Sequence, residues 1–95
     1  MSDYALSRFT VHVGEEFDVL EGPGTRWILT EATGYGEVVD PTTHNAFSLL
    51  FRGAPDPVFA QQMVTLRHPA IGEQVIFVTP IAQDASGVTY QAVFN

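Results

Sequence analysis

The side chains that could do chemistry in this 95-residue sequence are three histidines, eleven acids and four serines, with no cysteine and no lysine. The histidines, His12, His44 and His68, are separated by 32 and 24 residues. Zinc sites usually combine ligands at short spacings, such as two histidines four residues apart on a helix. The acids are dispersed and form no Asp-x-Asp-x-Asp calcium loop. We therefore expect no metal and no other cofactor.

Catalytic arrangements are equally weak. Serine hydrolysis needs a serine beside a histidine that a carboxylate orients, but Ser48 lies in an apolar run and Ser86 in a turn. Without cysteine or lysine there is no thiolate, Schiff-base or P-loop chemistry. The segment Gly34-Tyr-Gly36 lacks the third glycine and the following helix of a dinucleotide site. We expect no catalytic residue, and an enzyme is the least favoured function.

The charge balance excludes two classes of partner. The net charge is −7 and the pI is about 4.5, with four arginines spread along the chain. Nucleic acids and anionic membranes both attract basic surfaces, so neither is expected as a partner. Arg52 and Arg67 each end an expected strand and are candidate anion contacts. Ion pairing with neighbouring acids is the interpretation that we favour for both.

The apolar positions alternate along the chain with period two, which is typical of half-buried β-strands. Turn signals at Glu21–Gly24, Gly53–Pro57 and Asp84–Gly87 separate the alternating runs. The expected strands are Phe9–Val13, Phe17–Val19, Thr25–Thr33, Ala46–Arg52, Gln62–Arg67, Glu73–Ile81 and Val88–Phe94, with a short edge strand at Val38-Val39 and one helical turn at Val58–Gln61.

These runs predict a single all-β domain over residues 1–95, with almost no helix. Six or seven short antiparallel strands are typical of a sandwich or of a small, partly open barrel, and both remain open. The expected core is Phe17, Val19, Trp27, Leu29, Phe47, Leu49, Phe51, Leu66, Phe77, Ile81, Tyr90, Ala92 and Phe94.

One expected strand is apolar on both faces. We assign Phe77 and Ile81 to the core, which leaves Ile76 and Val78 facing outward and in need of cover. Either a loop supplies that cover, or another protein chain does, and a homodimer is the commonest closed solution. The candidate interaction surface comprises Tyr4, Tyr35, Val58, Phe59, Ile76 and Val78.

Several runs of residues are also familiar as a set. The sequence resembles a family of small bacterial proteins catalogued as a domain of unknown function. The residues that carry this resemblance are Ala46–Gly53, Gln62, His68–Gly72, Ile76–Ile81 and Tyr90–Asn95. Members of that family are often encoded near proteins with phage-tail-collar-like domains. The resemblance therefore implies a structural or accessory role in a tail-fibre-like assembly, and it implies no catalytic residue.

The expected function is a non-enzymatic structural or protein-interaction module. The alternative is a β-barrel that binds a small apolar or sugar-like ligand, which would need an internal cavity. The N-terminus lacks the basic and apolar stretches of a signal peptide, and no apolar run could span a membrane. We expect a cytoplasmic protein, unless a dedicated machine exports it.

Overall fold

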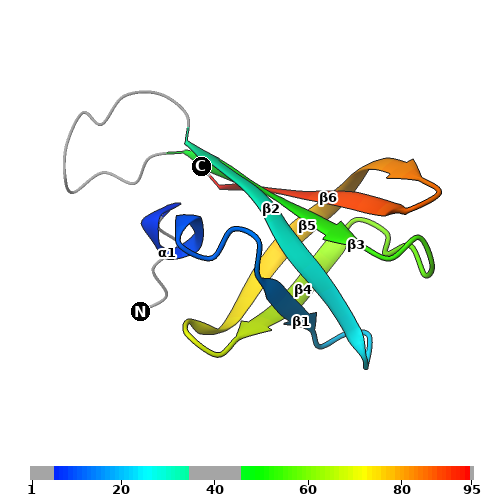
Figure 1. Cartoon of the computed structure of the whole chain (residues 1–95), viewed down its shortest axis with the longest axis horizontal. Helices are drawn as coiled ribbons and strands as arrows, with labels where there is room; N and C mark the ends of the chain where they lie inside the picture. The colour runs from blue at the N-terminus through cyan, green and yellow to red at the C-terminus, as the bar shows by residue number, and fades with distance from the viewer. Residues whose placement is uncertain (1–5, 35–45, 95) are drawn as a thin grey trace.

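The computed structural model describes residues 6–34 and 46–94, and it consists of one short helix and six strands (Figure 1). No helix in those residues is long and apolar enough to cross a bilayer. The elements are α1 (Leu6–Thr10), β1 (Glu16–Val19), β2 (Thr25–Gly34), β3 (Phe47–Gly53), β4 (Gln62–His68), β5 (Gly72–Asp84) and β6 (Gly87–Phe94).

The six strands form a closed antiparallel barrel in the order β1-β2-β3-β6-β5-β4. The all-β prediction is confirmed, and of the two architectures left open the barrel is the one observed. Each of the two long strands, β2 and β5, pairs with its two neighbours along different parts of its length. The first part of β2 pairs with β1 and the rest with β3, while β5 pairs with β4 up to Val78 and with β6 from Thr79. Both long strands carry a register shift, at Leu29/Glu31 and at Pro80/Ala82, which helps a strand to bend.

The barrel closes between β1 and β4, where the ladder is only two residue pairs long. A side chain extends this short seam. The Glu21 carboxylate accepts the Thr65 backbone N–H at 2.7 Å and the Thr65 hydroxyl at 3.0 Å. Partial desolvation acts to raise the pKa of Glu21, but the hydrogen bonds from Thr65 outweigh it and the pKa is lowered. The seam is therefore held by an ionised carboxylate as well as by backbone.

Side chains from all six strands and α1 fill the interior. Trp27 stacks on Tyr90 with ring centroids 4.0 Å apart, and Phe47 stacks on Phe94 at 4.4 Å. Ten of the thirteen expected core residues are buried, and Phe94 is partly buried against them. The buried residues that the expectation missed are Phe9, Val64, Ile76, Val78 and Val88.

The prediction for the two faces of β5 is wrong. Ile76 and Val78 are 2% and 0% exposed, whereas Phe77 and Ile81 are 48% and 50% exposed. The register between β4 and β5 determines which side of β5 faces the interior. Ile76 pairs with the buried Val64 of β4, and cross-strand partners point to the same face of a sheet. Ile76 and Val78 therefore cannot belong to an interaction surface.

The expected first strand, Phe9–Val13, is also wrong. Residues 6–10 form α1, and a turn follows in which the His12 N–H donates to the Phe9 carbonyl. Phe9 is buried against Phe47 and Phe94, with centroids 6.2 Å from each, while Val11 is 70% exposed. Figure 1 shows α1 at one end of the barrel and the β3–β4 connection at the other. Helix α1 thus covers one end of the barrel.

Candidate functional sites

The fold brings together two of the histidines that the sequence keeps 56 residues apart. His12 Nδ1 lies 3.0 Å and His68 Nε2 lies 2.7 Å from the same carboxylate oxygen, Oε1 of Glu15. The two imidazole rings contact each other with centroids 4.3 Å apart, and His68 also packs on Phe17. We call His12, Glu15 and His68 the histidine clasp. It joins the turn after α1 to the end of β4.

The hydrogen bonds of the clasp determine where the protons lie. The Ala70 backbone N–H donates to Nδ1 of His68 over 3.0 Å, so this nitrogen must offer its lone pair. The single proton of the neutral ring is then on Nε2, which donates it to Glu15. His12 donates to the same carboxylate through Nδ1. The Glu15 carboxylate is therefore the acceptor for both rings.

Two histidines and a carboxylate are also a common donor set for transition metals, and here three potential ligand atoms lie within 4.8 Å of one another. A histidine that binds a metal through Nε2 carries its proton on Nδ1 and usually donates it to an oxygen acceptor. In His68 that position faces the Ala70 N–H, so the two donors would oppose each other. The arrangement therefore suits a hydrogen-bonded clasp better than a metal centre, and the absence of a metal stays a prediction.

The clasp should make stability depend on pH. Hydrogen bonds from His68 and then from His12 lower the pKa of Glu15 from its usual 4.5. A depressed carboxyl pKa contributes stability above the unfolded value, and this contribution is lost as pH falls through the folded value. We expect the wild type to exceed Glu15→Gln in urea midpoint at pH 7 and this advantage to shrink below about pH 4.5. Parallel midpoint curves down to pH 3 would contradict the clasp.

Asp84 provides a comparison for that experiment. Bonds from the Ser86 side chain and backbone, and then from Arg52, lower its pKa from 3.8 to about 2. The advantage of the wild type over Asp84→Asn should therefore persist to lower pH than its advantage over Glu15→Gln. Urea midpoints of both variants, measured across the same pH series, separate the two carboxyls.

The arginines proposed as anion contacts are paired with protein groups. Arg52 donates to Asp84, to the Ser86 hydroxyl at 2.9 Å and to the Thr89 hydroxyl at 2.9 Å. Arg67 lies 3.6 Å from Asp18, an exposed and longer contact. These contacts agree with the ion-pair interpretation. Anion binding by either arginine stays a prediction.

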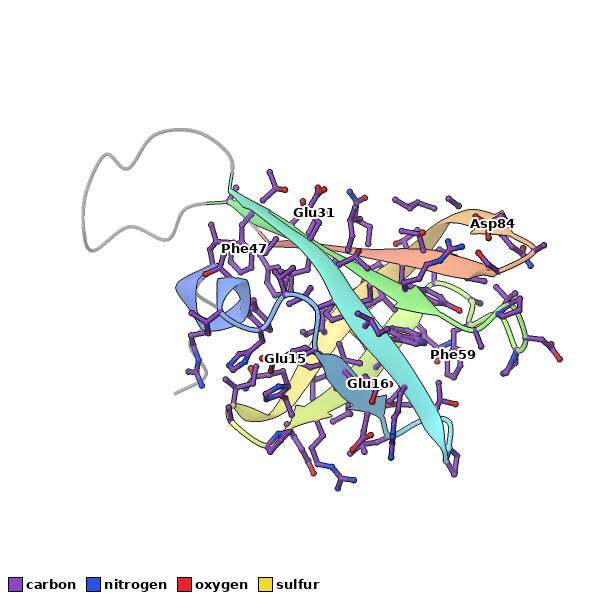
Figure 2. All side chains as sticks on the ribbon, in the orientation of Figure 1. Glu15, Glu16, Glu31, Phe47, Phe59 and Asp84 are labelled. Carbon is purple, nitrogen blue, oxygen red and sulfur yellow. The ribbon has the colours of Figure 1, made fainter. Side chains whose placement is uncertain are left out.

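The opposite end of the barrel is covered by the connection between β3 and β4. The Phe59 backbone N–H donates to the Tyr90 hydroxyl at 2.8 Å, and the Phe59 ring packs edge-on against Trp27. Figure 2 shows Phe59 and Asp84 at this end, away from Glu15 and Phe47. Phe59 is thus half-buried and structural, whereas Val58 is exposed. Tyr4 and Tyr35 lie outside the described residues.

A surface that the sequence analysis did not identify lies on the outer side of β4 and β5. Met63 and Phe77 are direct cross-strand partners and are 52% and 48% exposed. Val75 and Ile81, on the same strand as Phe77, are each 50% exposed. We call Met63, Val75, Phe77 and Ile81 the apolar face. The sequence shows that β5 is apolar on both sides, but this pattern does not indicate which of the two sides faces outward.

At one end the apolar face continues into a shallow recess of about 320 Å³. Its lining carries no charged side chain and comprises Val58, Pro80, Ile81, Ala82, Gln83 and Val88. Val58, which the sequence analysis placed in an interaction surface, thus adjoins the apolar face through Ile81.

These features define a small closed β-barrel with one end plugged by a helix, a filled interior and an uncharged apolar outer face. The chain belongs to the family described as Domain of unknown function (DUF6916), whose model matches residues 4–94. No curated protein and no solved structure matches the chain.

Proposed function

We propose that this domain is a non-enzymatic module that binds another protein through the apolar face. The observation that carries the proposal is the cross-strand pair Met63–Phe77, flanked by Val75, with about half of each side chain exposed. Scattered single apolar residues are normal on protein surfaces, but a contiguous cluster on one face is typical of an interaction site. Such a surface needs no catalytic group.

The charge pattern supports the same proposal. On the outer side, Phe77 lies beside Met63 and Thr79, both uncharged, and Val75 lies opposite the uncharged Thr65. The nearest charged groups are Glu21, whose carboxylate is bonded to Thr65, and the cross-strand partners Arg67 and Glu73 at the end of the β4–β5 ladder. Depletion of charge at the centre with a polar rim is what distinguishes interface cores from the remaining surface.

The alternative, a barrel that binds a small ligand, finds less support. A ligand barrel needs an internal cavity of several hundred Å³, roughly 300–1,000 Å³ for a drug-sized molecule. Here aromatic and aliphatic side chains occupy the interior. Within residues 6–34 and 46–94, every buried side-chain nitrogen or oxygen already has a hydrogen-bond partner, so none is left to orient a ligand.

The particular setting that we propose is an accessory role in a tail-fibre-like assembly, as the resemblance in sequence implies. The partner in that case is a structural protein of the assembly, and its contact surface is apolar where it meets Phe77.

An affinity capture from the native host tests this function. The wild type, Phe77→Thr and Ile28→Thr serve as baits, because both variants replace an exposed strand residue by a β-branched polar one. We expect the wild type and Ile28→Thr to retain the same partners, identified by mass spectrometry, and Phe77→Thr to lose them. Identical capture by all three baits would reject the apolar face as the binding surface.

A further inference from the structure

The second half of β5 has a neighbouring strand on one side only. Strand β5 pairs with β4 up to Val78, and residues 79–84 continue beside β6 alone (Figure 1). Strand β2 extends beyond β1 in the same way, but there α1 packs against it, with the Leu6 side chain next to Gly34. No other strand of the described residues pairs with residues 79–84. We call this part of β5 the open edge.

The open edge is exposed to solvent. Residues 81–84 are all exposed, although successive side chains of a strand point to opposite faces. The residues opposite them in β6, Gly87 and Val88, are buried. Solvent therefore reaches β5 from the side on which β4 is missing, and the backbone on that side is accessible.

The register shows which backbone groups lie on the free side. Asp84 and Gly87 are partners across a loop of two residues, so they must bond to each other, because a wider pair would need a bond between adjacent residues. Gln83, one residue earlier, then directs its N–H and C=O away from β6. Pro80 is the partner of Tyr90 but has no N–H, which places it at a position without ladder bonds and directs its carbonyl to the free side as well.

The uncharged recess of about 320 Å³ borders the open edge. Pro80, Ile81, Ala82 and Gln83 line it from β5, and Val58 lines it from the β3–β4 connection. A strand laid along an open edge bonds through its backbone and places alternate side chains in neighbouring recesses. We propose that the protein partner supplies an extended segment that adds to the open edge as a further strand, with an apolar side chain in the recess. This inference rests on the proposed function and specifies the form of the partner.

The backbone groups favour a different chain over a second copy. If the open edges of two copies paired about a two-fold axis between Pro80 and Gln83, each Gln83 N–H would meet a Pro80 carbonyl. Proline has no N–H to return a bond to the Gln83 carbonyl, so that pairing leaves acceptors unsatisfied. The charge of −7 on each copy adds repulsion. A partner strand without proline satisfies the Gln83 N–H and both carbonyls.

Amide hydrogen exchange of the full chain, followed by NMR, tests the open edge without a partner. We expect the Gln83 amide to exchange at least about tenfold faster than the Ala82 amide, which faces β6. A Gln83 amide that is protected in the free chain would overturn the inference, because the edge would then be closed already. Protection that rises with protein concentration would show self-pairing and would also overturn it.

Capture from the native host with Gln83→Pro and Gln83→Ala as baits tests the added strand. Proline at this position removes the outward N–H and no bond to β6, whereas alanine removes only the side chain and is the matched control. We expect the wild type and Gln83→Ala to capture the same protein and Gln83→Pro to recover at least about tenfold less of it. In the complex of the wild type with the captured and purified protein, the Gln83 amide should become protected.

Equal capture by Gln83→Pro and the wild type, or a Gln83 amide that stays unprotected in the complex, would overturn the added strand. If Phe77→Thr still loses the partner in that case, the proposed function stands. Equal capture by Gln83→Pro, Phe77→Thr and the wild type, or no captured protein at all, would reject the proposed function too. Should Gln83→Pro fail to fold, as judged by its urea midpoint, the amide protection in the wild-type complex decides.

Discussion

Gly53→Ala is expected to destabilise the barrel by about 3 kcal/mol, a large part of the roughly 5–15 kcal/mol typical of a domain. A Cβ at Gly53 would lie 2.5 Å from Cδ1 and 2.6 Å from Nε1 of the Trp27 indole. The indole cannot retreat, because it stacks on Tyr90 at 4.0 Å and meets Phe59 edge-on. Urea midpoints and slopes measure the loss.

Two further variants show whether the indole is the cause. Trp27→Leu removes the ring that the new methyl group would meet, so Gly53→Ala should cost clearly less in that background, and a double-mutant cycle measures the coupling. Gly34→Ala is the matched control, since its Cβ would meet only the end of the flexible Leu6 side chain at 2.9 Å. Equal losses at Gly53 and Gly34, with no coupling to Trp27, would contradict this close contact.

Phe9→Ala is expected to lower the free energy of unfolding by about 3–5 kcal/mol, the usual cost of removing a fully buried phenylalanine. Phe9 is 1% exposed, and its ring lies 6.2 Å from the rings of both Phe47 and Phe94. Its removal opens the α1 end of the barrel and leaves those two stacked rings without cover.

Val11→Ala is the control that separates the two interpretations of this segment. If residues 9–13 formed a strand, Phe9 and Val11 would share a buried face and both variants would be costly. The helix and turn leave Val11 70% exposed, so Val11→Ala should stay within about 0.5 kcal/mol of the wild type. Comparable losses in the two variants, from urea denaturation, would favour the strand.

The sequence identified the six strands of the barrel by two signals. A strand either has one face much more apolar than the other, or it lies between turns that contain glycine and proline. The last strand, Val88–Phe94, shows this most clearly, since Tyr90 and Ala92 are buried as expected and Val93 is exposed. The pattern failed at Phe9–Val13, where an alternation of only three apolar residues is too short to exclude a helical turn.

The candidate surfaces were less accessible to prediction. Glu15 and His68 lie 53 residues apart, so no spacing rule relates them. The residues of the apolar face depend on which side of β5 faces the interior. Because β5 has apolar residues on both sides, the sequence pattern could not show whether Phe77 or Ile76 is buried. Pairing with β4 and the bulge at Pro80/Ala82 made that choice.

By itself, then, the amino-acid sequence determined the two-residue alternation of apolar side chains, the positions of the turns and the net charge. These are local properties, set by backbone sterics and side-chain type within a few residues. Only the tertiary structure decided that the sheet closes, that α1 covers one end, that β5 turns Phe77 outward, and that His12 and His68 meet on Glu15. Each of these depends on which distant strands pair and in which register, because a shift of one residue reverses the face of every side chain on a strand.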